Sequence, residues 1–123
     1  MIPNVAPWMF YLSYLREFTL ESFYSEKNGL IELFLRNGCL MLCAENAIYS
    51  YDEKYENFVF AFKKLDPGHL NELKRVLVLG MGLGSIPLIL ERQYGPQFKF
   101  TMVEYDEDLA VLAQQYSLPR LKG

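Results

Sequence analysis

Three glycines at alternate positions are the residues of this chain best suited to shape a ligand site. Gly80, Gly82 and Gly84 follow the apolar run VLVL, which is typical of a strand buried on both faces, and they precede a helical pattern ending at Gly95. Glycine lets the backbone turn sharply and lets a ligand approach it closely. We expect Ser85 to cap the helix, whose free N–H groups would favour a polar or anionic ligand at the turn.

An acidic residue ends the next predicted strand, KFTMVE. Glu104 follows Gly84 by about 20 residues, a position from which a carboxylate can accept hydrogen bonds from both hydroxyls of a ribose. Asp106 is placed to cap a last helix through DLAVLAQQY. The order strand, glycine turn, helix, strand and acid predicts a right-handed β-α-β unit that binds a nucleotide. The alternative is a tight turn without a ligand, followed by a surface glutamate.

A small sheet is expected before this unit. Alternating apolar and polar residues predict strands over 17–26, 30–36, 39–43 and 47–51. Two Asn-Gly dipeptides, Asn28-Gly29 and Asn37-Gly38, separate the first three strands. This dipeptide favours a type I′ hairpin turn, in which both central residues need positive φ. The first half of the chain is therefore predicted to be a four-stranded antiparallel meander.

A helix is expected to follow the sheet. Ser50 and Glu53 fit a capping box, aromatic residues then recur at helical spacing as far as Phe62, and Pro67 ends the pattern. We interpret this aromatic stripe as core packing rather than as a binding surface.

The other titratable residues of this region are interpreted as solvated groups. Asp52, Glu53 and Glu56 form an acidic cluster that we interpret as an exposed helix start. The one histidine, His69, falls in a polar segment and is expected to be a loop side chain rather than a catalyst.

Composition restricts the class of protein. The chain has 123 residues, a net charge of −3 and a pI of about 5.2, which argues against a nucleic-acid binder because such a protein needs a basic surface. Cys39 and Cys43 would share a strand face. We expect a buried thiol pair there rather than a disulfide or a zinc site, which fits a reducing cytosol and a cytoplasmic location.

The N-terminal segment, MIPNVAPWMFYLSYLREF, is apolar but too short to span a bilayer and carries no basic leader, so no membrane association is expected. We interpret residues 1–16 as an aromatic arm that packs on this subunit or on a neighbour. Residues 17–52 are then a small β-domain, and residues 53–123 a helix with part of a nucleotide-binding domain.

The spacing of the glycines resembles one particular nucleotide-binding family. The NAD pattern G-x-G-x-x-G would require a glycine where the chain has Ser85, so NAD binding is kept only as a weaker alternative. The arrangement Gly80-x-Gly82-x-Gly84 resembles the first motif of class I S-adenosylmethionine-dependent methyltransferases, and Glu104 matches their ribose-binding acid. In that family the turn approaches the amino-acid part of the ligand.

The order of the whole chain is similar to that of spermidine synthase. An antiparallel sheet, then AIYSYDEKYENFVFAFKKL, then RVLVLGMGLG resembles a β-domain ahead of a Rossmann-like methyltransferase domain, over roughly residues 17 to 116. The resemblance implies an α/β fold that begins β-α-β-α. It also implies an adenosyl ligand, either S-adenosylmethionine or a relative such as its decarboxylated form or methylthioadenosine.

The polyamine-binding positions of that family are not matched. Leu83 stands where spermidine synthases carry an acid that holds the aminopropyl amine, Glu56 and Asn57 replace a Tyr-His pair, and Tyr49 replaces a glutamine. The resemblance therefore implies the adenosine site but not the polyamine site.

Two classes of function are compatible with the sequence. The chain is expected to be the adenosyl-binding portion of a transferase, truncated before the family's catalytic aspartate, so catalytic residues stay unassigned. The alternative is a non-catalytic assembly module that dimerises through the arm, with Trp8, Phe10, Tyr11 and Tyr14 at the interface. A two-stranded parallel unit is also expected to leave apolar surface uncovered.

Overall fold

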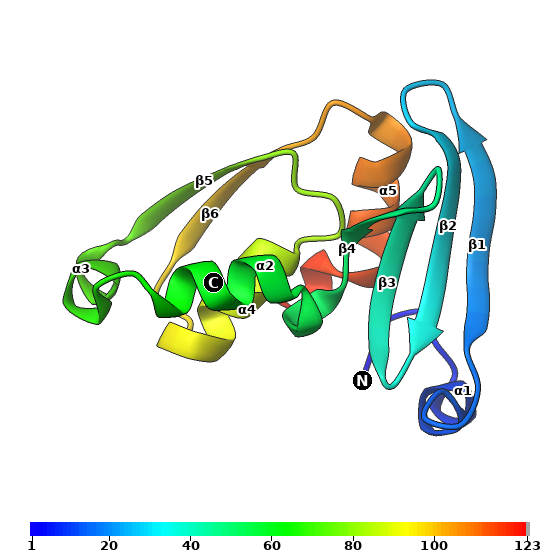
Figure 1. Cartoon of the computed structure of the whole chain (residues 1–123), viewed down its shortest axis with the longest axis horizontal. Coiled ribbons are helices and arrows are strands. Elements are labelled where there is room, and N and C mark those ends of the chain that lie inside the picture. The colour runs from blue at the N-terminus through cyan, green and yellow to red at the C-terminus, as the bar shows by residue number, and fades with distance from the viewer. Residues whose placement is uncertain (123) are drawn as a thin grey trace.

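The computed structural model describes residues 1–122 as a mixed α/β chain (Figure 1). A four-stranded antiparallel sheet comes first, and helices and a pair of parallel strands follow it. In Figure 1 the antiparallel sheet stands at one end of the molecule and the parallel pair at the other. Within the described residues, every helix is too short or too polar to cross a membrane.

The antiparallel sheet is the predicted meander. Its strands β1 (Phe18–Ser25), β2 (Gly29–Arg36), β3 (Cys39–Ala44) and β4 (Ala47–Ser50) pair in sequence order. Alternate residues of β2, namely Ile31, Leu33 and Leu35, are completely buried. They pack in one core with Leu109 and Leu112 of helix α5 (Glu107–Tyr116), which lies beside the sheet in Figure 1. The meander prediction is therefore confirmed.

The two Asn-Gly hairpins have different turns. Asn37 and Gly38 have φ values of 51° and 71°, as the predicted type I′ turn requires. The prediction for the β1–β2 hairpin is wrong, because positive φ there occurs at Gly29 but not at Asn28. Ser25 pairs with Gly29 across a three-residue loop, which favours a type I turn followed by a left-handed glycine.

The helix after the sheet begins later than the capping box predicted. Residues Asp52–Lys54 form a short 3-10 helix, and α2 spans Glu56–Lys63. Ser50 does not cap it, because the Ser50 hydroxyl bonds instead to the Ser85 hydroxyl at 2.9 Å. A further short helix, α3 (Pro67–Glu72), follows with Asp66 as its cap. His69 therefore lies in a helix rather than a loop, although it is exposed as expected.

The second half contains the predicted β-α-β unit. Strands β5 (Arg75–Leu79) and β6 (Lys99–Val103) are parallel and are connected through α4 (Ser85–Tyr94), and the chain continues through α5 to a 3-10 turn at Leu118–Arg120. Leu77 and Leu79 are 61% and 73% exposed. This confirms that the parallel pair leaves apolar surface uncovered.

The N-terminal segment packs on its own chain. Helix α1 spans Pro7–Leu12, and Ile2 is buried in the core that the sheet and α5 share. The backbone carbonyl of Ser13 accepts a hydrogen bond from Asn37, and its hydroxyl accepts one from Gly38, both at 2.9 Å. These bonds fix the segment against the β2–β3 turn.

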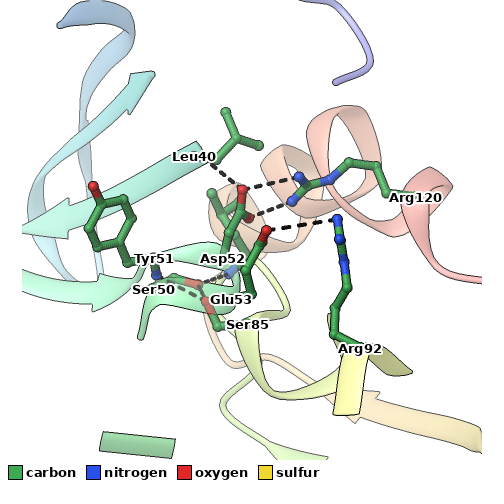
Figure 2. A network of polar contacts seen from close by, with 9 residues as sticks. Leu40, Ser50, Tyr51, Asp52, Glu53, Ser85, Arg92 and Arg120 are labelled. Carbon is green, nitrogen blue, oxygen red and sulfur yellow. Dashed lines mark hydrogen bonds and ion pairs between the residues drawn. The ribbon is translucent and has the colours of Figure 1, made fainter. Parts of the chain in front are cut away.

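Buried polar contacts join the sheet to the second half of the chain (Figure 2). Asp52 is only 2% exposed, accepts a hydrogen bond from the Leu40 backbone at 2.8 Å, and forms an ion pair with Arg120. The prediction of a solvated cluster is therefore wrong for Asp52, because a cation from the distant 3-10 turn compensates its charge. Glu53 is half-buried and pairs with Arg92, while Glu56 is exposed.

Candidate ligand cavity beside the glycine turn

A cavity of about 340 Å³ lies where the glycine turn meets β4 and α2. Gly80 and Gly82 line it, together with Glu104 from the end of β6. The structure thus brings together three of the four residues that the sequence assigned to a ligand. Gly84 is not part of the lining; it is buried beneath the turn as the residue preceding α4.

The backbone of the turn requires glycine. The φ values of Gly80, Gly82 and Gly84 are 73°, 52° and 81°, a region that residues with a Cβ avoid. A Cβ built on Gly80 would have no atom within 4 Å, so the surface there is open to a ligand. The prediction that Ser85 caps α4 is wrong. Gly84 takes the cap position, and the Ser85 hydroxyl bonds to Ser50.

Glu104 is fixed in place by backbone donors. One carboxylate oxygen accepts a hydrogen bond from the N–H of Gly82 at 3.0 Å, and the other accepts one from the N–H of Asp106 at 3.1 Å. The side chain is half-buried at the edge of the cavity. Each carboxylate oxygen can accept a second hydrogen bond. The group is therefore oriented toward the turn and retains capacity for donors on a ligand.

Asp106 connects this acid to the N-terminal sheet. As predicted, it caps α5, accepting from the N–H of Asp108 at 3.0 Å. Its carboxylate also accepts hydrogen bonds from the Ser25 hydroxyl and from the Asn28 amide, the latter at 2.6 Å. Burial alone would raise the pKa of Asp106, but the hydrogen bonds from Ser25, Asn28 and the α5 backbone outweigh it and hold this pKa below its usual value.

Asn28 is a cavity residue that the sequence analysis did not identify. It was interpreted only as a turn residue, yet its side chain reaches Asp106 and also lines the cavity. No local pattern marks this role, because it depends on α5 packing against a hairpin that precedes Asp106 by 78 residues.

Part of the cavity lining is aromatic. Tyr49 comes from β4, while Tyr55 and Phe58 come from the start of α2 with their ring centroids 5.3 Å apart. The interpretation of the aromatic stripe as core packing is therefore incomplete, since two of its members line a cavity. Among the described residues of the lining, Glu104 is the one charged side chain. A cavity with a single carboxylate and no cation favours a neutral or cationic ligand over a phosphate.

Leu83 has no contact with this cavity. It is 1% exposed, packs in the main core, and donates its backbone N–H to the Ser50 hydroxyl at 3.3 Å. The sequence placed it where an amine-binding acid would stand. The structure shows a core residue instead, so this position does not contribute a side chain to the wall.

A second cluster of possible ligand groups consists of Cys39, Asp52 and Glu53, whose ligand atoms lie within 4.8 Å of one another. Both carboxylates already face arginines. Burial, followed by the charges of Glu53 and Asp52, raises the pKa of the Cys39 thiol to about 11. A protonated thiol is a poor metal ligand, and the nearby guanidinium groups repel a cation, so this arrangement does not favour a metal ion.

Comparison with known proteins does not place the chain in a family. No protein-family model matches it, and a search of curated proteins finds no match.

Proposed function

We propose that the cavity binds an adenosyl ligand and that the chain is the adenosyl-binding portion of a methyltransferase-like or spermidine-synthase-like transferase. The observation that carries the proposal is the position of Glu104. Its carboxylate lies against the N–H of Gly82 at 3.0 Å, at the edge of a cavity that the glycine turn lines. A carboxylate at the end of the second strand of a β-α-β unit can bind the two hydroxyls of a ribose.

The charge of the lining favours a sulfonium or thioether ligand over a dinucleotide. NAD brings a pyrophosphate, and the described lining offers it no lysine or arginine while placing Glu104 nearby. S-adenosylmethionine, its decarboxylated form and methylthioadenosine carry no phosphate. The aromatic rings of Tyr49, Tyr55 and Phe58 can also attract a cationic ligand through their faces.

The chemistry proposed for the complete site is group transfer from an activated sulfonium. In such a reaction the electrophile is supplied by the ligand, so the protein acts mainly by holding the two reactants in line. The glycine turn and Glu104 would position the adenosyl part. The parallel pair with α4 and α5 would then be the first part of a Rossmann-like domain.

Titration calorimetry on the whole chain tests the proposal. We expect methylthioadenosine or S-adenosylmethionine to bind and NAD to bind more weakly. Glu104→Ala should weaken binding at least about tenfold, as expected for the loss of a hydrogen bond to a charged group. Glu107→Ala is the matched control, because Glu107 is an exposed acid outside the cavity. Unchanged affinity in Glu104→Ala would remove Glu104 from the site.

A second candidate function is assembly of two copies through the N-terminal segment. Six large apolar side chains there are exposed, namely Met1, Trp8, Tyr11, Leu12, Tyr14 and Leu15. Exposed apolar and aromatic side chains gathered in one segment are typical of interfaces between proteins. This patch supports a homodimer with or without an active ligand site.

Light scattering with point variants tests the assembly proposal. Deleting residues 1–16 would remove Ile2 from the core, so substitutions at exposed positions are the better probe. We expect the wild-type chain to be a dimer and Trp8→Ser with Leu15→Ser to be a monomer. Leu77→Ser is the control, since Leu77 is 61% exposed, close to the 59% of Trp8, but lies in β5. A wild-type monomer would exclude this function.

A further inference from the structure

The β1–β2 hairpin contributes one polar side chain to the cavity. Asn28 lies in the three-residue loop between Ser25 and Gly29, is half-buried, and lines the cavity together with Glu104. Its amide donates to the Asp106 carboxylate at 2.6 Å. Within residues 1–122, the Asn28 side chain makes this one hydrogen bond. Its carbonyl oxygen and its second N–H are therefore available to a ligand.

Asn28 and Glu104 are held by the same residue. The backbone N–H of Asp106 donates to Glu104, and the Asp106 side chain accepts from Asn28. A shared anchor places the amide and the carboxylate on the same part of the cavity lining. The two groups would then contact the same part of a bound molecule.

We propose that Asn28 is a specificity-determining residue that reads the ribose diol together with Glu104; this inference rests on the proposed adenosyl site. A carboxylate can only accept hydrogen bonds, whereas a hydroxyl can both donate and accept. Glu104 takes the hydroxyl protons of the diol, and the free N–H of Asn28 donates to a hydroxyl oxygen. The pair therefore selects a ribonucleoside over a deoxyribonucleoside.

The test is a set of titrations of the whole chain with methylthioadenosine and with its 2′-deoxy and 3′-deoxy analogues. We expect Asn28→Ala to weaken methylthioadenosine binding about threefold to tenfold, the range for one net hydrogen bond. The analogue that lacks the hydroxyl facing Asn28 should bind wild type and Asn28→Ala equally. Asn28→Ser, which keeps a turn-compatible residue, should behave like Asn28→Ala if the amide is what matters.

Ser25→Ala tests whether Asn28 contacts the ligand directly or only supports the fold. Ser25 donates to Asp106, does not line the cavity, and accepts hydrogen bonds from the backbone N–H groups of Lys27 at 3.1 Å and Asn28 at 3.3 Å. This variant therefore weakens the support of the loop and of Asp106 but keeps the Asn28 amide, so we expect a smaller loss of affinity than in Asn28→Ala. An equal loss of affinity for methylthioadenosine and for both deoxy analogues in Asn28→Ala would overturn the inference, because Asn28 would then act only as support. Wild-type affinity in Asn28→Ala, with Glu104→Ala weakened, would overturn it while leaving the adenosyl site intact. No binding by the wild type would instead overturn both.

Discussion

Arg120 follows Asp52 by 68 residues, yet its guanidinium contacts both oxygens of that buried carboxylate (Figure 2). Asp52 is 2% exposed and also accepts the backbone N–H of Leu40. Its φ of 41° is a left-handed value that few residues other than glycine, asparagine and aspartate adopt readily. The pair connects the end of the antiparallel sheet to the 3-10 turn after α5.

Removing one partner of this pair should destabilise the chain. Asp52→Asn keeps a side chain that tolerates left-handed φ but leaves the buried guanidinium without its counter-charge. We expect a loss of about 3 kcal/mol in the free energy of unfolding, measured by urea denaturation. Glu17→Gln is the control, because Glu17 forms an exposed pair with Arg36 at 4.0 Å and should cost less than about 1 kcal/mol. Equal losses in the free energy of unfolding would show that the buried pair contributes no more to stability than the exposed pair.

Stability in acid should depend on Asp106. Its pKa is lower in the folded chain than in the unfolded one, so its contribution is fully present above the unfolded pKa of about 3.9. The contribution is then lost as the pH falls through the lower folded value. We expect urea midpoints between pH 7 and pH 2 to fall less steeply with acid in Asp106→Asn than in the wild type. Glu107→Gln, an exposed acid on the next residue, should retain the wild-type slope.

The elements could be predicted because their signals are local. Alternation in LIELFLR, the Asn37-Gly38 turn and the glycine turn after VLVL each depend on a few neighbouring residues, and all three were confirmed. Gly80, Gly82 and Glu104 were found together at one cavity for the same reason, since a β-α-β unit brings the ends of its parallel strands to one edge.

Three of the errors involve partners that are distant in the sequence. Ser50 looked like a helix cap but bonds to Ser85, and Asp52 looked solvated but pairs with Arg120. Asn28 looked like a turn residue but binds Asp106. In each case a short polar side chain suited a local role, and tertiary packing gave it a different partner. The spacing of residues cannot predict these hydrogen-bond partners, because the partners depend on which surfaces pack together in the folded chain.

The two cysteines should differ in reactivity. Both are free, but Cys39 is 4% exposed, and burial with the nearby Glu53 and Asp52 raises its thiol pKa to about 11. Cys43 is half-buried, and burial followed by the charge of Glu32 raises its pKa as well. Since the thiolate is the reactive form, we expect iodoacetamide at pH 8 to label Cys43 first, as followed by peptide mass spectrometry. Both should react alike in urea; faster labelling of Cys39 in the folded chain would contradict this assignment.

A methyl group on the glycine turn should impair binding more than stability. At Gly80, φ is 73° and a Cβ would meet no atom within 4 Å, so Gly80→Ala adds a methyl to the open surface of the cavity lining. The backbone cost is about 1–2 kcal/mol. We expect methylthioadenosine affinity to fall at least about tenfold, because the turn can no longer be approached closely.

Gly95→Ala is the control for this variant. Gly95 also has positive φ, at 89°, and open space around its Cβ position, but it lies at the end of α4 outside the cavity. The Gly95→Ala variant should have a lower melting temperature than the wild type and the same ligand affinity. Equal effects of the two variants on affinity would show that Gly80 acts only through stability.

The most direct test of the adenosyl site is a crystal structure of the chain with methylthioadenosine. We predict that both ribose hydroxyls lie about 2.7 Å from the Glu104 carboxylate oxygens, with the ligand in the cavity between the glycine turn and Tyr49. A ligand bound elsewhere, or one whose ribose faces away from Glu104, would contradict the proposed function.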